Sequence, residues 1–192
     1  DSESLALEKF WLQTKQSRIM LAGTMKDFNN LNTDLQVTIN QLAAADLVRF
    51  APNWPAGIDV RGAASARGTG NALDTKFRLA LAGADISGTL RADVLSVAKP
   101  YDGELVIRGL EVAKLLPVKN FSGVAGADIK FSGAGTNLDS IKGAGTASLR
   151  SAVANGINVG DVTLQGTFSP KVADFTGALQ GPVGEASWRS HL

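Results

Sequence analysis

The chain has 192 residues, a formal net charge of +1 and no cysteine. Charged residues of both signs are interspersed. This argues against a basic surface that binds nucleic acid or an anionic membrane. The missing thiols exclude a disulfide framework and a thiolate metal site. Glycine and alanine together make up about a quarter of the residues, so the fold must either bring its sheets close together or leave space between them.

Alternation of apolar and polar residues with period two is the main pattern along the chain. Residues 1–16 are the least regular part, because the alternation fails at residues 10–12, and we predict a strand there rather than a helix. Turn-forming residues, among them those at 100–103 and 155–156, separate the later segments. Clear half-buried strands follow at residues 35–40, 77–81, 86–91 and 161–168. Strands at this spacing predict an all-β fold of consecutive antiparallel hairpins.

Two segments interrupt the alternation with apolar residues at helical spacing. They cover residues 42–50 and 110–116, and each stops just before a proline, Pro52 or Pro117. Each segment predicts a helix of one or two turns immediately after a strand. We expect these helices to cap one end or edge of the sheet.

The same order of elements recurs at a spacing of roughly 65 to 68 residues, which indicates a repeat architecture. Residues 34–52 and 103–117 correspond in pattern, and a Gly-rich alternating strand follows each of them. We place one copy at about residues 17–84, a second at 85–154 and a partial third at 155–192. No linker separates the copies, so residues 1–192 are interpreted as one continuous repetitive-β segment, cut from a longer protein.

No group of residues predicts catalysis. His191, the single histidine, lies one position from the end, where a rigid Ser–His–Asp arrangement is not expected. The glycine pairs at 68 and 70 and at 133 and 135 lack the further residues of a phosphate loop and are interpreted as structural. The aspartates stand singly on polar faces, which favours a solubilising role over a metal site. We therefore predict a protein that is not an enzyme and has no cofactor or metal.

The apolar stripes of the strands leave two interpretations open. They can form the core of a β-sandwich, or they can line the concave surface of a curved sheet. A continuous apolar groove suits acyl chains, because hydrophobic attraction is non-directional and scales with the apolar area removed from water.

Residues 115–165 carry a resemblance to a known family. Leu115-Leu116-Pro117 precedes a Gly-rich strand from Phe121, a Leu138-Asp139 turn, a second Gly-rich strand to Leu149 and an Asn155-Gly156-Ile157 element. This order resembles the AsmA/TamB family, most closely over about residues 100 to 165 and more faintly over 17 to 95. The resemblance implies an elongated, curved, taco-like β-groove with an apolar interior and short helices after the repeat strands.

The resemblance also implies a location and a role. Members of this family are periplasmic proteins of diderm bacteria, anchored in the inner membrane by an N-terminal helix. The family acts in phospholipid transport between the inner and outer membranes and in outer-membrane biogenesis, including translocation and assembly of β-barrel proteins. It has no catalytic residues to carry over to this sequence.

Our leading hypothesis is a non-enzymatic, envelope-bridging segment whose partners are phospholipid acyl chains. The alternatives are a scaffold that pairs its strand edges with an outer-membrane β-barrel protein, and a secreted β-repeat adhesin or binding module. No nucleic-acid partner is expected. The predicted groove-lining residues are the inward apolar ones: Leu35, Val37, Ile39, Phe77, Leu79, Leu81, Ile129, Phe131, Val162, Leu164, Phe168 and Phe175.

Overall fold

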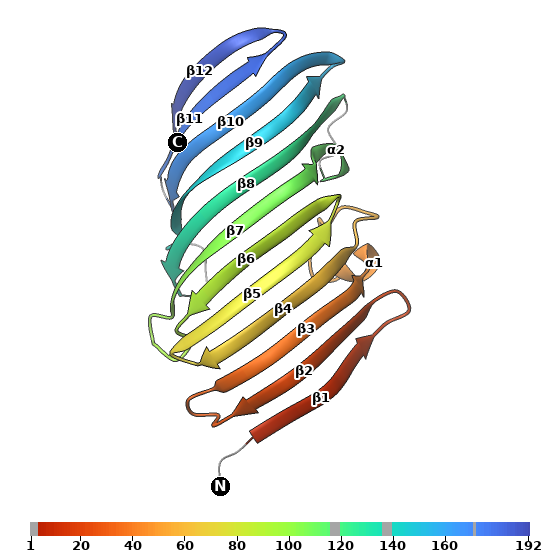
Figure 1. The fold of residues 1–192 in the computed structure, drawn as a ribbon, viewed down its shortest axis with the longest axis vertical. Coiled ribbons are helices and arrows are strands. Elements are labelled where there is room, and N and C mark those ends of the chain that lie inside the picture. The colour runs from red at the N-terminus through yellow and green to blue at the C-terminus, as the bar shows by residue number, and fades with distance from the viewer. Residues whose placement is uncertain (1–3, 116–119, 136–139, 171) are drawn as a thin grey trace.

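In the computed structural model, the chain forms one antiparallel sheet of twelve strands whose spatial order follows the chain order (Figure 1). The structure describes residues 4–115, 120–135, 140–170 and 172–192. The strands are β1 (Ser4–Gln13), β2 (Arg18–Lys26), β3 (Asn32–Leu42), β4 (Val60–Thr69), β5 (Ala72–Leu81), β6 (Ala84–Ala92), β7 (Pro100–Glu111), β8 (Phe121–Ala134), β9 (Lys142–Ala154), β10 (Ile157–Ser169), β11 (Val172–Gly181) and β12 (Gly184–His191). The prediction of an all-β fold built from consecutive antiparallel hairpins is confirmed. The sheet is open, with β1 and β12 at its two edges, so it does not show a closed taco-like groove.

The first strand explains the irregular pattern at the N-terminus. Residues 1–16 were predicted as a strand, and β1 confirms this over Ser4–Gln13. Its pairing with β2 shifts register between Leu7 and Phe10. An extra residue at such a bulge reverses which side chains face each side of the sheet. This shift is why the alternation fails at residues 10–12.

Two short helices follow β3 and β7. They are α1 (Ala44–Leu47) and α2 (Val112–Leu115), and both lie at the same end of the strands (Figure 1). They confirm the predicted positions, but both predicted segments (42–50 and 110–116) begin too early, because Leu42 belongs to β3 and residues 110–111 belong to β7. α1 also ends earlier than predicted, at Leu47, and Pro117 lies outside the described residues. A register shift precedes each helix, between Ile39 and Leu42 on β3 and between Ile107 and Leu110 on β7. The order strand, strand, helix, strand, strand therefore occurs in residues 18–81 and again in residues 84–154.

A polar network holds the start of α1. The buried Ser17 hydroxyl accepts a hydrogen bond from the Ala43 amide (2.9 Å) and donates one to the Asp46 carboxylate. Asp59 accepts hydrogen bonds from the Ala44 amide (2.9 Å) and from the Gln41 side chain (2.8 Å). Amides at a helix start have no partner inside the helix, so these side chains satisfy them. The network fixes α1 against the β1–β2 hairpin.

One predicted turn is wrong. Residues 100–103 were predicted as a turn, but Pro100 begins β7 and the chain reverses before it, at residues 93–99. The Asp93 carboxylate accepts hydrogen bonds from the amides of Leu95 (3.1 Å) and Ser96 (2.8 Å), which forms the turn. Proline is tolerated at the first residue of a strand, so Pro100 does not prevent pairing.

The sheet is a single layer with little core. The whole chain exposes 12448 Å², whereas a compact monomer of 20.0 kDa exposes about 8,700 Å². In the described part of the chain, the buried hydrophobic residues are Ala43, Ala44, Ile58, Val60, Ala84 and Ala152, and no large side chain is fully buried. Both faces of the sheet are therefore largely accessible, and the sandwich-core interpretation does not hold for the described residues.

Candidate functional site: the apolar face of the sheet

The strand register places all twelve predicted groove-lining residues on one face of the sheet. Directly paired positions share a face, and one row runs from Val37 through Phe77 and Ile129 to Phe175. A second row joins Leu35 to Phe131 and Phe168, and a third joins Ile39 to Leu79 and Leu164. Leu81 and Val162 share this face by alternation. We call it the apolar face.

The apolar face has no covering layer in the described part of the chain. Eleven of the twelve residues are half-buried, and Leu164 is 36% exposed. Each of the three rows crosses all or most of the strands without a charged residue. A contiguous apolar surface that extends over many strands and is accessible to solvent usually marks an interaction site.

Six aromatic rings on this face lie over glycines of the neighbouring strand. A β-carbon added at any of these glycines would lie between 2.2 and 2.7 Å from a ring or hydroxyl atom of its directly paired partner, closer than non-bonded atoms approach. Each ring therefore occupies the space that a side chain would need. The pairs are Phe77–Gly88, Tyr101–Gly133, Phe131–Gly103, Phe168–Gly143, Phe175–Gly166 and Trp188–Gly177.

This packing accounts for six of the 21 glycines, and it differs from the sequence-based expectation. The glycines do not bring two sheets together. They let rings lie down against a single sheet, a known way of stabilising glycines within strands. As a result, the aromatic rings project little from the sheet, and the apolar face is continuous.

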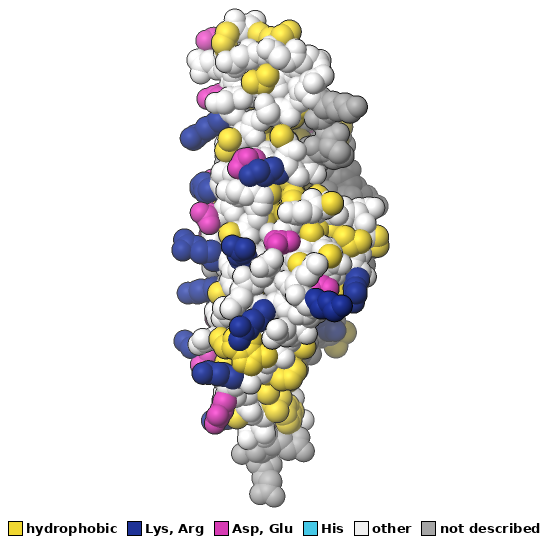
Figure 2. Space-filling model, turned by 90° about the vertical axis from the view of Figure 1, so that its right-hand side faces the viewer, with side chains coloured by type: hydrophobic (Ala, Val, Ile, Leu, Met, Phe, Trp, Pro, Cys, Tyr) yellow, Lys and Arg dark blue, Asp and Glu magenta, His cyan; other side chains and the backbone are white. Residues whose placement is uncertain are grey.

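The opposite face is polar. Figure 2 shows Lys, Arg, Asp and Glu side chains in a column along the left side of the view, and most of the hydrophobic side chains in view lie to its right. Charges alternate across one row of the register, from Asp34 through Arg67, Asp74 and Arg91 to Asp102. Opposite charges facing each other across strands favour the observed register.

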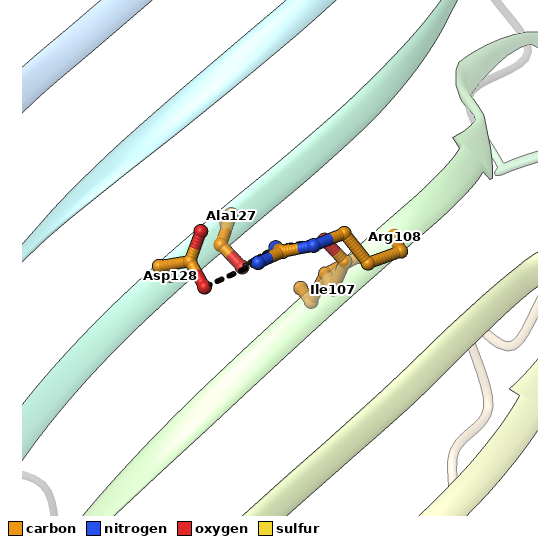
Figure 3. Close-up of polar contacts among 4 residues, drawn as sticks. All are labelled: Ile107, Arg108, Ala127 and Asp128. Carbon is orange, nitrogen blue, oxygen red and sulfur yellow. Dashed lines mark hydrogen bonds and ion pairs between the residues drawn. The ribbon is translucent and has the colours of Figure 1, made fainter.

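Arg108 makes three side-chain hydrogen bonds on the polar face. Its guanidinium donates hydrogen bonds to the carbonyl oxygens of Ile107 (3.0 Å) and Ala127 (3.1 Å) and lies 2.6 Å from the Asp128 carboxylate (Figure 3). The hydrogen bond to Asp128 raises the pKa of Arg108 further above its ordinary value. These contacts lie beside the register shift that precedes α2, so Arg108 bridges β7 and β8 where their ladder is interrupted.

Among the described residues, hollows lie on the polar face, whereas the sequence-based hypothesis places a groove on the apolar face. One, of about 890 Å³, extends over β7 to β12, and another, of about 670 Å³, over β7 to β11. They share Asp128, Thr146, Gln165 and Thr176. The hollows form where small residues such as Ala144 stand between longer charged side chains. On the apolar face, aromatic rings fill the space over the glycines.

The residues with possible chemistry do not come together. His191 lies 2.7 Å from Asp174 across β11 and β12, but both are exposed, and among the described residues no hydroxyl group hydrogen-bonds to the ring. In the same part of the chain, no three His, Cys, Asp or Glu residues are grouped so as to hold a metal ion. Of the described helices, none is long and apolar enough to cross a bilayer.

Several residues of the apolar face were missed by the sequence-based prediction. Ile19, Leu21, Leu105 and Ile107 stand at alternate positions of β2 and β7, but the alternation is weak there because Met20, Ala22 and Val106 between them are also apolar. The register shift in β1 hides the alignment of Phe10 and Leu12 with the same rows. Trp188 could have been found only through its pairing with Gly177, because β12 is otherwise polar.

Comparison with protein-family models, with curated proteins and with solved structures finds no match.

Proposed function

We propose that this chain is a non-enzymatic segment that carries phospholipid acyl chains along the apolar face of its sheet, in the periplasm of a diderm bacterium and between its two membranes. The proposal combines the resemblance to the AsmA/TamB family with one structural observation. That observation is an apolar face that continues across the sheet and has no covering layer among the described residues.

The dimensions of the face suit lipid. Twelve strands about 4.8 Å apart give a face about 53 Å wide. A bilayer core about 30 Å thick implies acyl chains about 15 Å long, so several could lie on the face. Burial contributes about 0.8 kcal/mol for each methylene group, which needs no specific polar contact. The uncharged rows that include Phe77, Phe131 and Leu164 provide this surface.

In this proposal the sheet curls toward its apolar face when lipid is bound, which gives the taco-like groove. The flat rings allow such curling, because they rest on glycine rather than on a bulky neighbour. The charged residues on the other face stay in water, so the two faces have separate roles.

Site-specific photo-crosslinking tests the proposal. A photoreactive amino acid at Leu79 or Leu164 should capture phospholipid in cells, since both residues lie on the apolar face. The matched controls are the adjacent Arg78 and Gln165, which face the opposite side and should capture none. Lipid extracted from the purified protein and identified by mass spectrometry gives a second readout. Equal labelling at both pairs of positions would reject the proposal.

A second function is favoured by the edge strand β1. Within the described chain, β1 pairs only with β2 and exposes Leu5, Phe10 and Leu12, at 47%, 46% and 55%. An edge with free backbone groups and apolar side chains can accept a strand from another protein. Assembly of an outer-membrane β-barrel by this edge predicts crosslinks from β1 to a barrel protein, with none from Leu79 to lipid.

A further inference from the structure

The polar face of β4, β5 and β6 has a surplus of positive charge that is not visible along the sequence. The charged residues of these strands are Arg61, Arg67, Asp74, Lys76, Arg78, Asp85 and Arg91. All seven are exposed and share one face, because alternation and register bring them together. These five cations and two anions give this part of the sheet a net charge of +3, whereas the net charge of the whole chain is +1.

Three of these cations have no acidic partner in the part of the chain that the structure describes. Lys76 lies opposite Ser65 and Thr89, and Arg78 lies opposite Ala63 and Ser87. Arg61 lies opposite Ala80. Among the described residues, no ion pair forms at any of the three. We call Arg61, Lys76 and Arg78 the basic patch.

On the neighbouring strands, by contrast, cations form ion pairs with carboxylates. On β7 and β8, Lys130 lies 3.0 Å from Glu104, and Arg108 lies 2.6 Å from Asp128. The same fold therefore supplies a carboxylate for each of these cations. At the basic patch, hydroxyl and methyl groups occupy the positions where carboxylates could stand.

The composition of the surroundings indicates the kind of partner. Hydroxyls of Ser65, Ser87 and Thr89 stand beside the cations and can both donate and accept hydrogen bonds. The polar face of β4 to β6 has no aromatic residue, so it offers neither the anchors of a protein interface nor a stacking surface for nucleic-acid bases. Charge together with hydroxyl groups, without an apolar anchor, suits an acidic polymer that is itself rich in hydroxyls.

We propose that the basic patch binds an anionic polysaccharide. Lys76 and Arg78 project two residues apart on β5, about 7 Å along the strand, and contact successive acidic groups of the polymer. The adjacent hydroxyls bind its sugar hydroxyls. This site lies on the face opposite the proposed lipid surface, so both could be occupied at the same time.

Binding of the intact chain to fluorescein-labelled polygalacturonate tests the proposal. The wild-type protein should bind the labelled polymer, and binding should weaken as salt is added, because the contacts are exposed and ionic. The double substitution Lys76→Thr with Arg78→Thr should weaken binding at least about tenfold. Threonine suits the strand, and both positions are exposed, so circular dichroism should show an unchanged fold.

The matched control is Lys130→Thr, which removes an ion-paired cation from the same face and should leave binding within about twofold of wild type. Neutral dextran should not bind. The proposal is overturned if the double variant binds as tightly as wild type, or if the wild-type protein does not bind polygalacturonate. Equally tight binding of poly-glutamate or single-stranded DNA would also overturn it, in favour of an acidic peptide or a nucleic acid.

Discussion

The indole ring of Trp188 lies directly over Gly177 of the neighbouring strand. A β-carbon at position 177 would lie 2.2 Å from both Cε2 and Cζ2 of that ring. Five other aromatic residues of the apolar face stand in the same relationship to a paired glycine. The apolar face is therefore built by pairing the largest side chains with residues that have none.

Gly177→Ala should destabilise the sheet by about 1–3 kcal/mol, because the added methyl group forces the indole out of its position. Trp188→Ala in the same chain should cancel most of this cost, since the atoms nearest to position 177 all belong to Trp188. Urea unfolding of wild type, both single variants and the double variant measures this coupling.

The control for this cycle is Gly126→Ala, in a strand but away from any ring. A β-carbon there would lie 3.2 Å from the Ile107 carbonyl oxygen and 3.5 Å from the Ser148 hydroxyl, so a smaller loss of stability is expected. Equal losses at positions 126 and 177, or additive effects in the double variant, would show that the ring does not fill the space over the glycine.

An open apolar face predicts an unusual tolerance to charge. Leu164→Lys should lower the free energy of unfolding by less than about 1 kcal/mol, because Leu164 is 36% exposed and the ammonium group can reach water. Ile58→Lys should cost more than about 3 kcal/mol, because Ile58 is only 6% exposed and an unpaired charge would be buried there. Chemical unfolding of the two variants checks the contrast, and similar losses would indicate that the apolar face is covered.

Leu164→Lys should also reduce the phospholipid that co-purifies with the protein. The positive charge interrupts an uncharged row that includes Leu79 and Ile107. Gln165→Lys places the same charge one residue away on the polar face and should leave lipid recovery unchanged. Mass spectrometry of the extracted lipid gives the comparison.

The sequence contains most of what decides the fold. Period-two alternation identifies which side chains share a face, and it correctly groups residues as distant as Leu35 and Phe175. Both short helices are predictable because helical spacing replaces alternation just before a proline. These features are local, so a single sequence shows them.

Other features depend on register, which a single sequence does not show. The contact of Trp188 with Gly177 and the grouping of Arg61 with Arg78 arise only when particular strands pair at particular positions. The register shift in β1 disguised a strand as an irregular segment. The position of the hollows on the polar face also follows from the sizes of side chains on neighbouring strands, which depend on the register.

Arg108→Lys should loosen the sheet where β7 meets α2. Lysine keeps the charge but cannot donate to the Ile107 and Ala127 carbonyl oxygens and to Asp128 together, because it lacks the planar fork of arginine. Amide hydrogen exchange should become faster for residues around the register shift at positions 107–110 and stay unchanged in β11. A uniform change along the chain, or none, would contradict the bridging role of Arg108.

Acid should weaken the corner where α1 meets the β1–β2 hairpin. Hydrogen bonds from the Ser17 and Thr14 hydroxyls lower the pKa of Asp46 below its ordinary value of 3.8. A carboxyl group whose pKa is lowered by folding stabilises the fold fully above its unfolded pKa and loses that contribution as the pH falls through the folded pKa. Wild type should therefore be more resistant to urea than Asp46→Asn at about pH 6, and the difference should shrink below about pH 4. Since the other carboxyl groups, including Asp27 with its own lowered pKa, are present in both proteins, this difference isolates Asp46. A difference that stays constant down to about pH 2.5 would mean that ionised Asp46 does not hold this corner.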